Sequence, residues 1–170
     1  SKAYFHLPGL FEFYDLYSVF LPLYREHREY FYDWCEIASV YGAPADCIWG
    51  GGRAGFGECD AENVLALMNE YDISSRLTFS NSLLKPEHLT DRKCNALCEL
   101  FAGSKGVQNG VIIHSDILLE YIKNNYHDLL AAFTMPELEN PQPKLFLLGN
   151  EAVALGALTS GAKFMSAYPI

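Results

Sequence analysis

The sequence predicts an α/β protein in which repeated strand-plus-helix units form a parallel sheet. From residue 46 onward, short apolar segments typical of buried strands alternate with amphipathic segments of helical periodicity. Half of the 170 residues are apolar and only 19% are charged, which supplies a large core. The units fit a partial barrel or an open three-layer sheet, because a complete eight-unit barrel needs about 200 to 250 residues.

Two aromatic-rich helices are predicted ahead of the sheet, since 14 of the 24 aromatic residues lie in the first 50 positions. In the first helix, apolar side chains recur every three residues from Leu10 to Phe20, and Pro22 ends it. In the second helix they recur at three and four residues, at Tyr24, His27, Phe31, Trp34 and Ala38. Each spacing predicts an aromatic face that packs on the sheet, with a ligand-stacking surface as the alternative.

The strand-plus-helix units follow the turn-rich segment 41–44. Three short segments are predicted to be strands: 46–49, 76–80 and 110–114. Helical segments follow them, namely 61–71 behind a cap at Asp60, a segment from Asp91 to the stop at Gly103, and one capped by Ser115. Right-handed crossovers between such units predict a parallel sheet.

The chain is predicted to divide into three parts: a partial barrel-like region 1–130, a linker 131–143, and a separate segment 144–170. Three prolines between residues 131 and 144 favour an extended connection. Two further strands are predicted at 145–148 and 164–167. If both parts contribute to one sheet, it has five parallel strands; if they do not, the first part is an incomplete barrel with exposed edges.

Charge and composition exclude several classes of protein. The formal charge of −9 argues against nucleic-acid binding, which needs clustered Lys and Arg. No apolar run approaches about 18 residues, so no membrane span is expected. Five irregularly spaced cysteines fit reduced thiols better than a disulfide framework, which predicts a cytoplasmic protein.

The candidate ligand site lies just beyond the predicted strands, because α/β proteins bind ligands at the carboxyl ends of their strands. It consists of Gly51, Gly52, Arg53, Asn81 and His114. Arg53 could hold a carboxylate or phosphate, and His114 could exchange a proton near neutral pH. The alternatives are an ion pair of Arg53 with a nearby carboxylate and a His114 that is bonded to backbone groups.

Two motifs are set aside. The run Gly50–Gly55 fits G-x-G-x-x-G, but the helix cap at Asp60 comes too late for a dinucleotide loop, and no carboxylate follows strand 76–80. Cys94 and Cys98 have a spacing that can help to hold a metal, yet no further ligands are placed. The two cysteines are therefore interpreted as small apolar core residues, and no metal site is predicted.

Four segments carry a resemblance: Tyr4–Phe11 (YFHLPGLF), Phe31–Cys35 (FYDWC), Cys47–Arg53 (CIWGGGR) and Leu77–Ser82 (LTFSNS). Together they resemble the N-terminal part of an uncharacterised family of anaerobe proteins that is distantly akin to collagenase-like peptidases. The resemblance runs to about Tyr126 and implies a TIM-barrel-like fold. Full members continue into a cysteine-rich segment associated with an iron–sulfur cluster, which has no counterpart in this sequence.

The last part of the chain resembles a different family. Leu145–Ala157 and Lys163–Ile170 are similar to the start of the α subunit of 2-oxoacid:ferredoxin oxidoreductases, where the thiamine-diphosphate pyrimidine domain begins. Asn150 and Glu151 match that family's motif and are interpreted as structural. The family's substrate-side threonine and cofactor-activating glutamate come after the point that corresponds to Ile170.

These observations lead to three functional hypotheses. The first is an incomplete or fused chain with no turnover of its own, in which thiamine diphosphate and iron–sulfur clusters are implied only by resemblance and no cofactor is expected in this chain. The second is a small-molecule binder that takes an anion or a sugar at the strand ends. The third is an interaction module that pairs with other oxidoreductase subunits or with itself.

Overall fold

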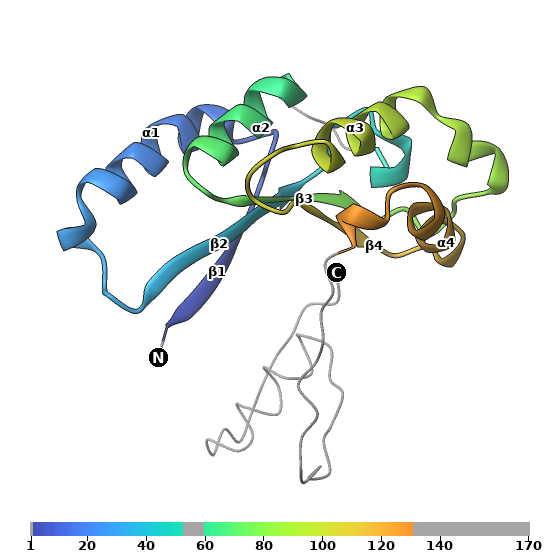
Figure 1. The fold of residues 1–170 in the computed structure, drawn as a ribbon. Helices are drawn as coiled ribbons and strands as arrows, with labels where there is room; N and C mark the ends of the chain where they lie inside the picture. The colour runs from blue at the N-terminus through green and yellow to red at the C-terminus, as the bar shows by residue number, and fades with distance from the viewer. Residues whose placement is uncertain (1, 53–59, 131–170) are drawn as a thin grey trace, which may run out of the picture. The chain divides into compact units, whose positions relative to one another are not determined.

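Four parallel strands form one sheet whose spatial order, β1-β2-β3-β4, follows the chain (Figure 1). The computed structural model describes residues 2–52 and 60–130. The strands are β1 Ala3–Pro8, β2 Cys35–Gly42, β3 Ser74–Phe79 and β4 Gly110–Ile113. The helices are α1 Tyr14–Glu26, α2 Ala61–Glu70, α3 Arg92–Ala102 and α4 Asp116–Asn125. The predicted α/β class with a parallel sheet is confirmed.

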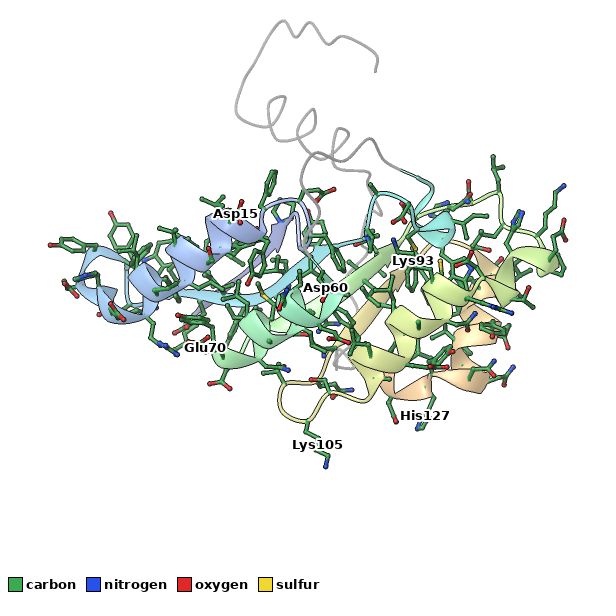
Figure 2. The ribbon with its side chains drawn as sticks, turned by 90° about the horizontal axis from the view of Figure 1, so that it is seen from above. Asp15, Asp60, Glu70, Lys93, Lys105 and His127 are labelled. Atoms are coloured by element: carbon green, nitrogen blue, oxygen red, sulfur yellow. The ribbon has the colours of Figure 1, made fainter. Side chains whose placement is uncertain are left out.

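The helices and strands alternate in the manner of consecutive barrel units. Each strand is added on the same side of the one before it, and right-handed crossovers then place the connecting helices on one face of the sheet. Figure 1 shows α1, α2 and α3 on that face, and Figure 2 shows the same helices from above, with Asp60 and Glu70 at the two ends of α2. The described strands show no reversal of order of the kind that marks a doubly wound sheet.

The core lies between the sheet and these helices. Its largest fully buried side chains include Trp49, Phe11, Phe79 and Phe101. From α4, Leu118 and Ile122 join the same cluster, so all four helices pack against one apolar layer. Alternation along the strands explains this layer, because every second residue of a strand points to the same face.

The N-terminal third differs from the prediction of two helices. Residues 3–8 form β1, and the region of the second predicted helix holds a short 3-10 turn, Arg28–Tyr30, followed by β2. The segment CEIASVYG can follow either a helical or a strand pattern over its eight residues. Hydrogen bonding to β1 on one side and β3 on the other decides in favour of the strand, and local periodicity does not contain that information.

Pro22 does not end the first helix, which continues to Glu26. Proline lacks the N–H that would bond one turn back, so the helix loses one hydrogen bond there. Tyr17 and Leu21 before the proline are buried against the sheet, and the Tyr24 hydroxyl after it donates to the Cys35 carbonyl at 2.8 Å. These tertiary contacts on both sides of the proline offset the lost bond.

The predicted strand at 46–49 is wrong. The chain there forms a loop and then a 3-10 turn, Ile48–Gly50. Cys47 and Trp49 are fully buried, which produces the apolar pattern without any strand pairing. The Trp49 indole N–H donates to the His88 carbonyl at 2.8 Å and fixes the turn against the segment before α3.

The predicted strands 76–80 and 110–114 are confirmed within two residues as β3 and β4. The predicted helices at 61–71, after Asp91 and after Ser115 are confirmed as α2, α3 and α4. Asp91 caps α3 by accepting from the Cys94 N–H at 2.8 Å, as an acidic N-cap residue is expected to do. The predicted linker 131–143, the segment 144–170 and their strands lie outside the described residues. In residues 2–52 and 60–130, no helix is long and apolar enough to cross a bilayer.

Candidate functional site

The predicted site residues lie after the 3-10 turn Ile48–Gly50 and after two of the strands. Gly51 and Gly52 follow the turn with φ of +88° and +67°, Asn81 follows β3 and His114 follows β4. A Cβ atom added to Gly51 would lie 3.8 Å from the Cβ of Asn81, so the structure brings these two positions together. Arg53 lies outside the described residues. The His114 side chain is exposed, and its backbone N–H donates to the Phe79 carbonyl at 3.2 Å.

Asn81 fastens the turn before the glycines to the end of β3. Its side-chain N–H donates to the Ile48 carbonyl at 2.9 Å, and its backbone N–H donates to the Trp49 carbonyl at 3.1 Å. Its side-chain oxygen accepts from the Leu83 N–H at 2.9 Å. Both ends of the amide therefore bond within the protein, and the ligand-binding role assigned to Asn81 stays a prediction.

A row of polar residues lies within the strands, on the sheet face opposite the helices. Leu77 and Phe79 are buried in the core beneath the helices, so alternation directs Arg76 and Thr78 to the other face. The pairing register then assigns the neighbouring strands' residues to that same face. This polar sheet face comprises His6, Ser39, Tyr41, Ser74, Arg76, Thr78 and Ile112.

Arg76 lies near the centre of the polar sheet face. It pairs in register with Tyr41 of β2 and with Gly110 of β4. A Cβ atom added to Gly110 would lie 2.9 Å from Nη1 and 3.2 Å from Cδ of Arg76. The arginine side chain therefore runs across β4 at the one position that has no side chain of its own.

The polar groups around Arg76 are incompletely bonded. Arg76 Nε and Thr78 Oγ1 are buried, and neither has a hydrogen-bond partner among the residues that the structure describes. Among residues 2–52 and 60–130, no carboxylate forms an ion pair with Arg76. Farther along the same face, His6 Nδ1 and Ser39 Oγ lie 2.6 Å apart and bond to each other. Arg76 and Thr78 thus have hydrogen-bonding capacity that the described protein groups do not use.

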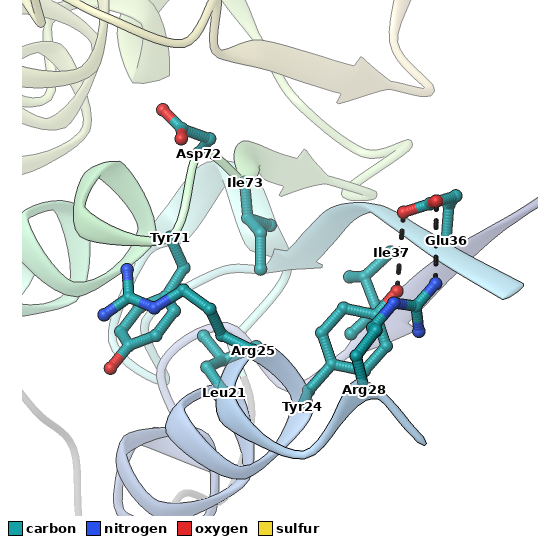
Figure 3. A pocket seen from close by; sticks show the side chains of 9 residues that line it. All are labelled: Leu21, Tyr24, Arg25, Arg28, Glu36, Ile37, Tyr71, Asp72 and Ile73. Atoms are coloured by element: carbon teal, nitrogen blue, oxygen red, sulfur yellow. Dashed lines mark hydrogen bonds and ion pairs between the residues drawn. The ribbon is translucent and has the colours of Figure 1, made fainter. Parts of the chain in front are cut away.

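A pocket of about 340 Å³ lies at the other end of the sheet, at the amino ends of β2 and β3 (Figure 3). Its lining includes Tyr24, Arg25 and Arg28 from α1 and the segment after it, Glu36 from β2, and Tyr71 before β3. In parallel α/β folds this end of the sheet serves stability more often than ligand binding.

Two charged side chains of this pocket, Glu36 and Arg25, already have partners in the protein. Glu36 Oε1 accepts a hydrogen bond from Lys2 Nζ at 2.8 Å. The same oxygen lies 3.5 Å from Arg28 Nη2, and Figure 3 shows this ion pair. The pKa of Glu36 is lowered below its ordinary value, chiefly by the hydrogen bond from Lys2. Burial opposes this effect, and the positive charges of Lys2 and Arg28 add to it. The Arg25 guanidinium lies 4.1 Å from the centre of the Tyr71 ring, where it makes a cation–π contact. The Glu36 carboxylate is thus shared between Lys2 and Arg28, while Nη1 of Arg28 is buried without a hydrogen-bond partner among the described residues.

Three cysteines of the described residues are buried in the core. Cys94 and Cys98 are both buried, as predicted, and the Cys94 sulfur lies 3.1 Å from the sulfur of the third, Cys47. In the part of the chain that the structure describes, no group of three or more His, Cys, Asp or Glu side chains could hold a metal ion.

Comparison of the chain with protein-family models, curated proteins and solved structures finds no match. The two resemblances noted from the sequence therefore stay predictions. The segment that carries the thiamine-diphosphate resemblance, residues 144–170, also lies outside the described residues.

The sequence did carry a signal for Arg76 and Thr78. In SSRLTF the polar residues Arg76 and Thr78 alternate with Leu77 and Phe79, whereas a parallel strand buried on both faces is apolar throughout. An arginine in mid-strand therefore indicates one polar face. No local signal marks Cys47 as the neighbour of Cys94, because the two residues are far apart in the chain and only the fold brings them together.

Proposed function

We propose that the polar sheet face binds a small oxyanion, a carboxylate or a phosphate, with Arg76 as its anchor. The observation that carries this proposal is that two buried atoms, Arg76 Nε and Thr78 Oγ1, have no hydrogen-bond partner within residues 2–52 and 60–130. A buried polar group without a partner costs about 1–3 kcal/mol, so a ligand that bonds to both atoms removes a cost of that size at each of them. This is the small-molecule hypothesis drawn from the sequence, with its anchor within β3 in place of Arg53.

The chemistry of the face matches an oxyanion. A guanidinium presents parallel N–H donors that fit two oxygens of a carboxylate or phosphate. The Thr78 hydroxyl, two residues along the same strand and on the same face, can donate to a further oxygen. The described residues offer no carboxylate that would compete for the guanidinium. The residues of the face support binding, and we propose no chemical step there.

The proposal predicts that small oxyanions stabilise the whole chain against heat. At a phosphate concentration ten times its Kd, the gain is about 1.4 kcal/mol. For a domain of this size that corresponds to a rise in Tm of about 3–6 °C. Thermal unfolding in sodium phosphate, sodium pyruvate and sodium chloride of matched ionic strength measures the shift and separates phosphate from carboxylate ligands.

Two variants test whether Arg76 is the anchor. Arg76→Gln is expected to abolish the shift, while Arg92→Gln, which removes an exposed arginine at the start of α3, keeps it. Gly110→Ala retains the guanidinium but places a methyl group where it lies, so we expect the shift to fall with little change in the Tm of the ligand-free protein. An undiminished shift in Arg76→Gln would refute the proposal.

A second candidate function, association with another copy of the chain, is favoured by the outer surface of α1. Apolar side chains are exposed along this helix beside its buried stripe: Phe13, just before its start, is 48% exposed, Leu16 is 60%, Val19 is 62% and Leu23 is 47%. Their spacing of three and four residues forms one continuous stripe. Two-fold pairing would let each stripe cover the identical stripe of another copy.

Light scattering of the full chain tests this association. We expect a dimer that becomes a monomer in Leu16→Lys/Val19→Lys, because two charged side chains would have to be buried in the contact. The control is Leu83→Lys, which changes a leucine that is 81% exposed and lies outside α1. This variant is expected to leave the dimer intact. A wild-type chain that stays monomeric at high concentration removes this candidate.

A further inference from the structure

Two buried thiols from distant parts of the chain meet in the core. Cys47 lies in the connection between β2 and α2, and Cys94 lies in the first turn of α3. Their sulfur atoms are 3.1 Å apart, and both residues are 0% exposed. The residues just before them, Asp46 and Lys93, form an ion pair at the surface. The two segments are therefore held together at two successive positions.

We propose that Cys47 and Cys94 form a site of reversible oxidation, at which a small hydroperoxide joins the two thiols as an intramolecular disulfide. A disulfide has a sulfur–sulfur length of about 2.05 Å, so closure requires an approach of only about 1 Å. The proposal does not depend on anion binding at the polar sheet face.

The surroundings of the two sulfur atoms distinguish their roles. The hydrogen bond from the Cys94 thiol, followed by bonds from the backbone N–H groups of Gly50 and Trp49, lowers the pKa of Cys47 below its ordinary value despite its burial. That same hydrogen bond to Cys47, and then burial, raise the pKa of Cys94. Because the Gly50 N–H bonds to the Cys47 sulfur and not to that of Cys94, we assign Cys47 as the thiolate that reacts with the oxidant and Cys94 as the thiol that resolves the product.

The oxidation proceeds in two balanced steps. The Cys47 thiolate attacks one peroxide oxygen, so that an S–O bond forms, the O–O bond breaks, and the leaving hydroxide takes up a proton to become water. The Cys94 sulfur then attacks the Cys47 sulfenic acid: the S–S bond forms, the S–O bond breaks, and a second water leaves with the Cys94 proton. Overall, two thiols are oxidised and one hydrogen peroxide is reduced to two waters.

A third thiol, that of Cys98, is also buried in the core, and burial raises its pKa. In residues 2–52 and 60–130 the cysteines do not combine with other ligands into a metal-binding group. The disulfide would link the connection between β2 and α2, in which Trp49 is buried, to the start of α3.

The test uses the full chain with Cys35→Ser, Cys59→Ser and Cys98→Ser, so that only Cys47 and Cys94 remain. After treatment with a small excess of hydrogen peroxide, we expect the intact mass to fall by two hydrogen atoms and the peptides that contain the two cysteines to be linked. Dithiothreitol restores the original mass. The oxidised chain is expected to unfold at a higher temperature than the reduced chain, because the bond restricts the unfolded state.

The chain with all its natural cysteines provides a second measurement, which does not depend on how the triple variant folds. Its peptide map is expected to link Cys47 to Cys94, and Cys94→Ser is expected to leave a sulfenic acid on Cys47 that dimedone traps. Linkage of Cys47 to Cys35 or Cys59, or two thiols that stay open to alkylation after peroxide, would overturn the proposal. So would dimedone labelling of Cys47 that is equal with and without Cys94.

Discussion

Trp49→Ala is expected to lower the free energy of unfolding by about 3–5 kcal/mol, the range measured for large aromatic side chains removed from cores. Trp49 is fully buried, its ring meets Phe79 and Tyr121 edge to face with centroids 5.3 and 5.9 Å away, and its N–H bonds to His88. The substitution removes these contacts together and leaves the His88 carbonyl without its donor. Urea unfolding followed by far-UV circular dichroism measures the loss.

Two variants separate the contributions of the Trp49 ring and its N–H group. Trp49→Phe keeps an aromatic ring but loses the donor, so a smaller cost of about 1–2 kcal/mol is expected. Trp34→Ala removes the other tryptophan, which is 46% exposed and stacks on Tyr32, and is expected to cost less than about 1 kcal/mol. Equal costs for Trp49→Ala and Trp34→Ala would show that the buried position of Trp49 is wrong.

Asn95→Ala is expected to destabilise the protein by about 2–4 kcal/mol, at about 1 kcal/mol for each lost hydrogen bond. The Asn95 side chain makes four such bonds. Its N–H groups donate to the Leu89 and Asp91 carbonyls at 2.9 and 2.7 Å, and its oxygen accepts from the Tyr121 and Tyr126 hydroxyls at 2.9 and 2.8 Å. This one amide connects the start of α3 to α4 and the turn that follows it.

Asn63→Ala is the matched control, because Asn63 is an exposed asparagine in the first turn of α2, as Asn95 lies near the start of α3. Alanine has the higher helix propensity, so this variant is expected to be neutral or slightly stabilising. The same propensity gain reduces the measured cost of Asn95→Ala by about 0.5 kcal/mol. If the two variants differ by less than 1 kcal/mol in urea unfolding, Asn95 does not organise this corner of the fold.

Local pattern was sufficient wherever a helix lay between clear start and stop signals. The segment from Asp91 to Gly103 was predicted from a cap, an apolar stripe and a glycine, and α3 runs from Arg92 to Ala102. The strands at 76–80 and 110–114 were also correct within two residues, because the first alternates polar with apolar residues, the second is a short apolar run, and each is next to a turn. These signals act over a few residues, so the sequence contains them in full.

Pattern failed where pairing between distant segments decided the structure. The segment that forms β2 fitted a helical stripe, and only its hydrogen bonds to β1 and β3 make it a strand. Conversely, the segment that contains Cys47 and Trp49 was predicted to be a strand because its residues are apolar, although they lie in a loop and a turn. Apolar residues indicate that a segment is buried, and they do not indicate whether it pairs with a neighbouring strand.

The candidate site shows the same division. The sequence led to the carboxyl ends of the strands, and Asn81 there serves to hold the turn Ile48–Gly50. The alternation of Arg76 and Thr78 with apolar residues was present in the sequence, but their lack of partners depends on every neighbouring strand and became evident only in the structure.

By itself, the sequence determined the α/β class, helices α2, α3 and α4, and strands β3 and β4 of the described residues, because capping, periodicity and apolar runs are local properties of the chain. Only the tertiary structure decided the N-terminal strands, the place of Arg76 over Gly110, and the contact between Cys47 and Cys94. The physical reason is that strand pairing and side-chain contacts join residues tens of positions apart, and the free energy that selects them arises only once the whole sheet and its core have formed.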